Sequence, residues 1–171
     1  RQAIRKMRTP LIVISPKSLL RNPKAVSTLD DLSNGSFECV IDDELDNKND
    51  VKKVIMCSGK VFYELIEKRN QEKRHDIAII RIEQLYPFPY DDLEEILLRY
   101  QNVHEYIWCQ EEPLNQGAWF SHRHRIQRVL DRLGNNNEVK LVSRPAAAAP
   151  AVGLMKLHLK QQETLINEAI V

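Results

Sequence analysis

Short apolar runs that alternate with helical patterns limit the possible folds of this chain more than any other feature of its sequence. The runs lie at residues 11–15, 54–57, 77–82, 106–109 and 139–142, and a weaker one at 37–41 suits a short edge strand. Continuous apolar runs of this length are typical of strands that are buried on both faces of a sheet. Because the runs alternate with helices, we expect an α/β fold: a mostly parallel, mixed sheet of about five strands with helices on both faces.

Helix signals separate the runs. Asn22 and Pro23 are typical of a helix start, and Asn34 followed by Gly35 is typical of a helix end, so the first helix is expected at about residues 22–32. Helical spacing of apolar residues predicts further helices from residue 61, at 91–100, at 118–133 and at 153–170. The acidic stretch at 42–50 is expected to be a flexible loop.

Length and composition suit one globular domain. The chain has 171 residues, of which 43% are apolar and 29% charged, enough for a hydrophobic core. A net charge of +1 favours neither nucleic acid nor a membrane as a partner, and no apolar run approaches the ~20 residues that span a bilayer. Residues 1–9 are basic and typical of the end of a linker or helix from a preceding domain, so we expect a linker at 1–9 and one domain at 10–171.

The three cysteines favour a reducing compartment. Their number is odd and no CxxC motif occurs. Cys57 and Cys109 lie inside apolar runs, where a small buried thiol is the simplest expectation. A disulfide framework is not expected at this length and cysteine density, so we expect a cytoplasmic protein.

Two adjacent carboxylates, Glu111 and Glu112, follow the apolar run at 106–109 directly. An unpartnered buried charge costs several kcal/mol, so this stretch is expected to be either a site or an interface. The glutamates could act as acid and base, but no nucleophile or metal-binding set accompanies them. Structural carboxylates that cap backbone amides, or that pair across an interface, fit better. The aromatic pair Trp119 and Phe120 also favours an interface.

Basic residues define a second candidate site. Lys17 and Arg21 follow the first apolar run, and Arg81 lies within the run at 77–82, so all three are expected at the carboxyl edge of the sheet. A buried arginine needs an anionic partner. That partner is either internal, one of Glu83, Glu111 and Glu112, or a ligand phosphate. Internal pairing is the preferred interpretation, with a phosphate site as the alternative.

The turn at Ser58-Gly59-Lys60 has two interpretations. Helix amides after a glycine turn are able to receive an anion. Alternatively, Gly59 only makes the turn and Lys60 is solvated. The chain contains neither GxxxxGK[ST] nor GxGxxG, so the second interpretation is preferred.

Several long motifs together resemble one family. They are Ser15-Pro16-Lys17-Ser18-Leu19-Leu20-Arg21, Cys57-Ser58-Gly59-Lys60-Val61, the stretch 81–89, the stretch 110–119, Arg144-Pro145-Ala146 and the stretch 158–163. In this order they resemble the C-terminal, transketolase C-terminal-like domain of the thiamine-dependent first component of bacterial 2-oxoglutarate dehydrogenase. The resemblance covers essentially the whole chain.

The resemblance implies a larger enzyme. That enzyme decarboxylates 2-oxoglutarate with thiamine diphosphate and magnesium and passes the succinyl group to the lipoyl-bearing second component of its complex. The implied partners are the preceding domains of the same polypeptide, a second copy in a homodimer, and the lipoyl-bearing succinyltransferase. No nucleic acid or membrane partner is expected.

The family's GDG…N magnesium motif is absent from this sequence. We therefore carry over no catalytic residue and expect this chain, taken alone, to be inactive and to bind neither cofactor. The expected role is structural and dimerising, with a loop ordered by Glu111, Glu112, Asn115, Gln116 and Trp119. The alternative is a regulatory acyl-CoA or nucleotide site, for which the resemblance suggests Lys17, Arg21, Arg81 and, less directly, Arg1.

Overall fold

A computed structural model describes residues 6–7 and 9–171 of the chain. The chain divides into two compact units, residues 1–36 and residues 37–171, and each is described by itself. The larger unit contains the sheet and every helix longer than one or two turns.

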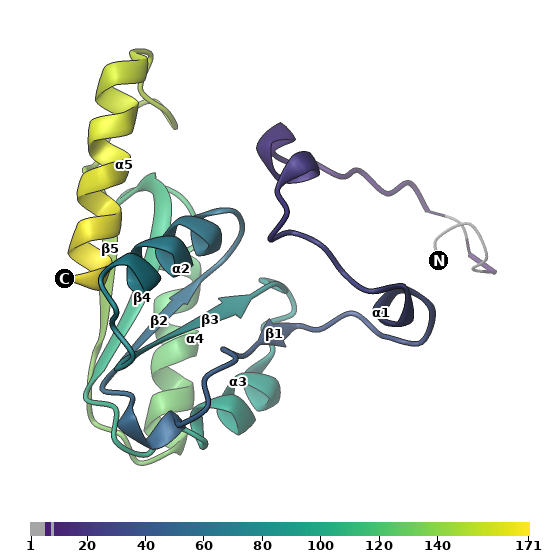
Figure 1. Cartoon of the computed structure of the whole chain (residues 1–171), viewed down its shortest axis with the longest axis vertical. Coiled ribbons are helices and arrows are strands. Elements are labelled where there is room, and N and C mark those ends of the chain that lie inside the picture. The colour runs from purple at the N-terminus through teal and green to yellow at the C-terminus, as the bar shows by residue number, and fades with distance from the viewer. Residues whose placement is uncertain (1–5, 8) are drawn as a thin grey trace. The chain divides into compact units, whose positions relative to one another are not determined.

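The larger unit is built on a five-stranded mixed sheet (Figure 1). Its strands are β1 (Val40–Ile41), β2 (Lys53–Cys57), β3 (Ile77–Ile82), β4 (Glu105–Pro113) and β5 (Val139–Arg144). They lie in the order β1-β3-β2-β4-β5. The short β1 pairs antiparallel with β3, and the remaining pairs are parallel. The expected α/β fold with a mostly parallel sheet is confirmed.

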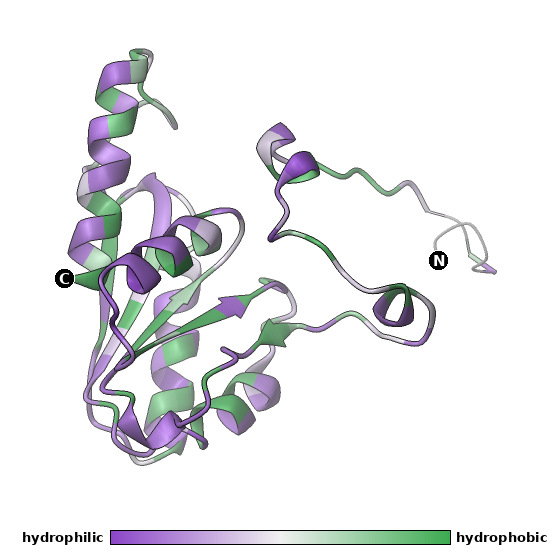
Figure 2. Ribbon diagram, in the orientation of Figure 1, coloured by the Kyte–Doolittle hydropathy of each residue, from purple (hydrophilic) through white to green (hydrophobic). Residues whose placement is uncertain are grey.

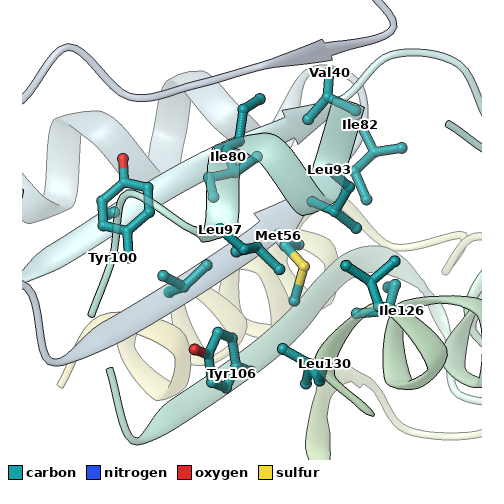
Figure 3. Close-up of a cluster of buried hydrophobic side chains, with 14 of the residues drawn as sticks. Val40, Met56, Ile80, Ile82, Leu93, Leu97, Tyr100, Tyr106, Ile126 and Leu130 are labelled. Carbon is teal, nitrogen blue, oxygen red and sulfur yellow. The ribbon is translucent and has the colours of Figure 1, made fainter. Parts of the chain in front are cut away.

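Two hydrophobic clusters cover the two faces of this sheet. Alternate residues of the central strands point to opposite sides, so Met56 and Ile80 belong to one cluster while Ile55 and Ile79 belong to the other. The helices α3 (Tyr90–Leu97) and α4 (Trp119–Arg132) pack on the first face, as Figure 3 shows for Leu93 and Ile126. The helices α2 (Val61–Gln71) and α5 (Met155–Ile170) pack on the second face.

Burial on both faces explains why these strands read as continuous apolar runs. Each covering helix turns one stripe of residues to the sheet, and hydrophilic residues are interspersed with hydrophobic ones along these helices in Figure 2. In α5 the buried stripe lies in the C-terminal half of the helix, at Gln162, Leu165, Ile166, Ala169 and Ile170. The first turns of α5 extend beyond the end of the sheet in Figure 1.

Two expectations for the first 36 residues are wrong. Residues 11–15 are not a strand, and their side chains are exposed. The helix expected at 22–32 is only α1 (Leu29–Ser33), preceded by a 3-10 turn, η2 (Lys17–Arg21). Asn22 does not cap a helix, because its side chain accepts a bond from the Lys24 amide in a local turn. Thr28 is the cap instead: it exchanges hydrogen bonds with Asp31 in a capping box.

The acidic stretch at 42–50 is tied to the sheet rather than flexible. Asp43 is buried and accepts hydrogen bonds from Arg69 and from the backbone amide of Ile79. Its neighbour Asp42 accepts from Lys48, and from the Tyr100 hydroxyl at 2.5 Å. The 3-10 turn η3 (Lys48–Asp50) positions that lysine. Local composition indicated a loop, but it did not reveal these distant partners.

Within residues 6–7 and 9–171, no helix is long and apolar enough to cross a bilayer.

Candidate functional site

The candidate site lies at the carboxyl edge of the sheet, where β2, β3, β4 and β5 all end. The carboxyl ends of parallel strands meet at one edge, and ligands of open α/β sheets bind along it. The turn at 58–60, the stretch at 83–89, the loop at 114–118 and the loop at 145–154 follow these strands.

Glu111 is held by partners from two helices. The Lys60 ammonium, at the start of α2, forms an ion pair with its carboxylate. The side-chain amide of Gln162, in α5, donates to the same oxygen at 2.9 Å. Lys60 is therefore not the solvated residue that was expected, and Arg81 is not the counter-charge of Glu111. The pairing satisfies a half-buried carboxylate without a ligand.

Arg144, at the end of β5, extends this network. Its guanidinium is buried and donates to the Gln162 side-chain oxygen. It also contacts Nδ1 of His158 at 3.1 Å, so that nitrogen is the acceptor. A chain of polar contacts thus runs from Lys60 through Glu111 and Gln162 to Arg144. It joins α2, β4, α5 and β5 at one edge of the sheet.

Glu112 differs from its neighbour. Its side chain is exposed and makes no hydrogen bond or ion pair among the described residues. Its side chain lines a cleft of about 380 Å³, together with Ser58, Gln110 and His122. The two glutamates point to different surroundings, so the geometry does not bring them together as an acid and base pair.

Gln110, which the sequence interpretation passed over, organises the loop after β4. Its side-chain oxygen accepts from the Trp108 indole and from the Trp119 backbone amide, both at 3.0 Å. Its side-chain nitrogen donates to the Pro113 and Gln116 carbonyls, at 3.3 and 2.7 Å. A single buried amide therefore closes the loop onto the first turn of α4.

Gly117 allows this arrangement. Its φ is +71°, a left-handed conformation that favours glycine. A Cβ atom placed here would lie 2.9 Å from the side-chain atoms of Gln110. Both the backbone conformation and the close approach of Gln110 therefore require glycine.

Asn115 and Gln116 hold the neighbouring loop. Asn115 exchanges two hydrogen bonds with the backbone of Ala147, each 3.0 Å long. Gln116 donates to the same Ala147 carbonyl at 3.0 Å. The loop after β4 thereby fixes the alanine-rich loop after β5, which has few polar side chains of its own.

His122 is a second residue to which the sequence interpretation assigned no role. It is buried in α4, and its Nε2 lies 2.8 Å from the Leu85 carbonyl in the stretch after β3. Its Nδ1 lies near the Ala118 carbonyl and 2.7 Å from the Ser121 hydroxyl. The ring stacks parallel to the Trp108 indole. A histidine on the apolar face of a predicted helix was the signal available in the sequence.

The basic residues are distributed over both units. Arg81 lies in β3, with its guanidinium 4.3 Å from the Phe62 ring centre and 3.7 Å from the Glu83 carboxylate. Its Nε has no hydrogen-bond partner among the described residues. Lys17 and Arg21 are exposed on η2 in the smaller unit. Arg1 lies outside the described residues.

The cysteines are consistent with structural roles. All three are free thiols, and Cys57 and Cys109 are buried in register on adjacent strands, as expected. Burial raises the pKa of Cys57, and burial together with the nearby Glu111 charge raises the pKa of Cys109 to about 12. The described part of the chain holds no group of three His, Cys, Asp or Glu side chains placed to bind a metal.

Several exposed apolar side chains lie in segments beyond the carboxyl ends of the strands. They follow β3, β4 and β5 and include Tyr86, Leu114, Phe120, Leu154, Met155 and Leu159. Their exposed fractions range from 43% for Leu114 to 84% for Tyr86. We call this set the carboxyl-edge surface.

Comparison with known proteins places the chain in a family. Residues 26–170 match the family described as 2-oxoglutarate dehydrogenase C-terminal. The chain is 56% identical to the 2-oxoglutarate dehydrogenase E1 component of Haemophilus influenzae and 48% identical to that of Azotobacter vinelandii. Each alignment covers 99% of this chain but only 18% of the relative. The resemblance seen in the motifs is confirmed, and the chain belongs to the 2-oxoglutarate dehydrogenase C-terminal family.

Proposed function

We propose that this chain is the structural and dimerising C-terminal domain of a 2-oxoglutarate dehydrogenase E1 component. The whole enzyme would be an oxidoreductase of the tricarboxylic acid cycle. It would decarboxylate 2-oxoglutarate and transfer the succinyl group to the lipoyl arm of its complex. The observation that carries this proposal is the 56% identity to such a component over 99% of the chain.

The contacts at the sheet edge support a structural role. Glu111 forms an ion pair with Lys60, and the Gln110 side chain makes four hydrogen bonds within its loop. The Asn115 side chain donates a hydrogen bond to the Ala147 carbonyl. Side chains that are engaged in this way hold loops in place. The carboxyl-edge surface is then the part of the domain available for contact with a second copy.

The enzyme's cofactors would be thiamine diphosphate and magnesium. Carboxylate and amide oxygens are the ligands that magnesium prefers. Glu111 already has an ion-pair partner, and the described residues offer no cluster of three metal-binding side chains. The described residues therefore do not fit a magnesium ion, and we propose that the rest of the enzyme holds this ion and thiamine diphosphate.

An activity measurement tests catalytic silence. The purified 171-residue chain, supplied with thiamine diphosphate, magnesium and 2-oxoglutarate, is expected to release no carbon dioxide above the rate without protein. The full-length enzyme under the same conditions is the positive control. Turnover by the isolated chain would overturn this part of the proposal.

A pair of charge substitutions tests the dimer. Phe120→Asp places a charge in the carboxyl-edge surface, whereas Leu98→Asp alters a similarly exposed apolar residue at the end of α3. In the full-length enzyme, sedimentation is expected to show a weakened dimer for Phe120→Asp alone. An unchanged dimer in both variants would argue against this surface as the subunit contact.

An anion-binding regulatory role is the second candidate. It is favoured by the Arg81 guanidinium, whose Nε is unpartnered among the described residues and whose nearest carboxylate is 3.7 Å away. A phosphate group would satisfy such a guanidinium better than this distant carboxylate does. Lys17 and Arg21 belong to the other unit and Arg1 lies outside the described residues, so this candidate site is argued from Arg81 alone.

Calorimetry with acetyl-CoA and with adenosine monophosphate tests this second role. Binding to the full-length enzyme is expected to be lost in Arg81→Ala and retained in Arg123→Ala, which removes an exposed arginine of α4. Absence of heat at millimolar ligand, or equal binding by both variants, would exclude Arg81 as an anion site.

A further inference from the structure

The segment Leu11-Ile12-Val13-Ile14 presents an unusual surface. Its four side chains are 69%, 83%, 74% and 95% exposed, and the segment belongs to no helix or strand. It forms an unbroken hydrophobic stretch in Figure 2. Four consecutive apolar side chains in contact with water are unfavourable, so such a stretch marks a surface that is covered in the working protein.

The pattern identifies the kind of cover. Successive side chains of a strand point to opposite faces, so an unbroken apolar run needs apolar cover on both sides. A segment lying on one flat surface would need apolar residues only at every second position. Pro10 and Pro16 bracket the run, and proline is tolerated at strand ends but not within a central strand. The run therefore has the length and boundaries of a buried strand.

The comparisons indicate where the cover lies. The family region begins at residue 26, but similarity to the relatives covers 99% of this chain, so it includes the apolar run. The relatives extend well beyond this chain, which spans 18% of their length. The run belongs to the smaller unit, residues 1–36, whose described part contains no strand. It is shared with the relatives, yet it precedes the C-terminal family region.

We propose that Leu11–Ile14 forms a strand buried on both faces of a sheet supplied by the part of the longer polypeptide outside this chain. Residues 16–36 then connect that sheet to the unit at 37–171. This inference rests on the proposed function in one respect, that the chain is part of a longer E1 polypeptide. It moves the domain boundary from residue 10, where the sequence interpretation placed it, to beyond Pro16.

Hydrogen–deuterium exchange tests the strand directly. In the full-length protein the amides of residues 11–15 are expected to exchange at least 100-fold more slowly than in the 171-residue chain. Fast exchange in both proteins would overturn the proposal. Equal protection in both would overturn it as well, because the covering sheet would then lie within this chain.

Adjacent substitutions test burial on both faces. Ile12→Lys and Val13→Lys point to opposite sides of the proposed strand, so each is expected to lower the thermal unfolding midpoint of the full-length protein by several degrees. Leu98→Lys, at an exposed apolar position of the larger unit, is the matched control. A loss confined to one of the two variants would show one-sided docking and contradict a buried strand. Exchange in the unsubstituted protein decides the matter if a variant fails to fold.

These outcomes are separable from those of the proposed function. If exchange shows that residues 11–15 do not form a buried strand, the proposed dimer contact at Phe120 is unaffected, because the Phe120→Asp test measures subunit association. Conversely, a dimer insensitive to Phe120→Asp says nothing about amide protection at residues 11–15.

Discussion

At the scale of single residues, the loop after β4 depends on Gln110 more than on the charged pair beside it. Gln110 is 3% exposed and makes hydrogen bonds to two carbonyls, one indole and one backbone amide. A buried polar group that loses its partner costs about 1–3 kcal/mol. Removing this one side-chain amide therefore leaves several groups unsatisfied at once.

We expect Gln110→Leu to lower the free energy of unfolding by about 2–4 kcal/mol, because the Trp108 indole and the Trp119 amide lose their acceptor. Leucine has a similar size, so the loss measures hydrogen bonding more than volume. Glu112→Gln, at an exposed position of the same strand, is expected to change stability by less than about 0.5 kcal/mol. Urea unfolding of the three proteins measures both values, and equal effects would contradict this assignment.

The glutamates were visible in the sequence because a charge after a buried strand is unusual. The role of Gln110 was not visible in the sequence, since a glutamine at this position is compatible with a surface site as well as with a buried one. Glu111 needed a partner, but the sequence suggested Arg81, whereas the structure provides Lys60. Pairing between distant segments depends on which strands are neighbours. The order β3-β2-β4 separates β3 from β4, and places the Lys60 turn next to Glu111.

At the scale of elements, the connection from β4 to α4 depends on the conformation of Gly117. Two effects oppose any other residue there, the positive φ and the contact with Gln110. Two other glycines separate these effects. Gly134 also has a positive φ, but nothing lies near a Cβ built on it, and Gly153 has neither constraint.

We expect Gly117→Ala to destabilise the chain by about 2–3 kcal/mol, since strain and collision add. Gly134→Ala should lower the free energy of unfolding by about 1 kcal/mol, because only the backbone strain at positive φ applies there. Gly153→Ala should be close to neutral. Thermal unfolding of the three variants checks this order. A Gly117 variant no worse than the Gly134 variant would show that Gln110 moves aside without cost.

The elements with strong periodicity were predictable, and those without local signals were not. The runs at 54–57, 77–82, 106–109 and 139–142 are strands because each is buried by helices within the same unit. The run at 11–15 looks the same in sequence, but its side chains are exposed and its own unit has no described strand beside it. The prediction of a helix at 22–32 was wrong because Thr28 and Asp31 form a capping box that starts the helix at Leu29.

At the scale of the whole molecule, ion pairs beside β3 and at the start of β4 make stability depend on pH. Burial alone would raise the pKa of Asp42, but hydrogen bonds from Lys48 and Tyr100 outweigh it and hold that pKa below its usual value. A hydrogen bond from Lys140 likewise lowers the pKa of Glu105, against the effect of burial. Carboxylates of this kind bind fewer protons in the folded chain than in the unfolded chain.

The stabilising contribution of such groups is fully present above their unfolded pKa, near 4, and is lost as the pH falls through the lower folded pKa. We therefore expect the free energy of unfolding to fall between about pH 5 and about pH 2. Asp42→Asn should lower stability by about 1.5 kcal/mol at neutral pH, because Lys48 and Tyr100 lose a charged acceptor. The difference from the unsubstituted chain should shrink as the pH falls, because the native aspartate then becomes protonated.

Asp46→Asn is the matched control, since Asp46 is an exposed carboxylate of the same acidic stretch. Urea unfolding at several pH values would give the three curves. A gap between the Asp42 variant and the unsubstituted chain that stays constant down to pH 2 would mean that asparagine disturbs packing rather than charge. A gap that closes on acidification would identify the Asp42 cluster as a titrating link between the acidic stretch at 42–50 and α3, whose following turn carries Tyr100. Stability of the sheet would then depend on a charged cluster outside the candidate site.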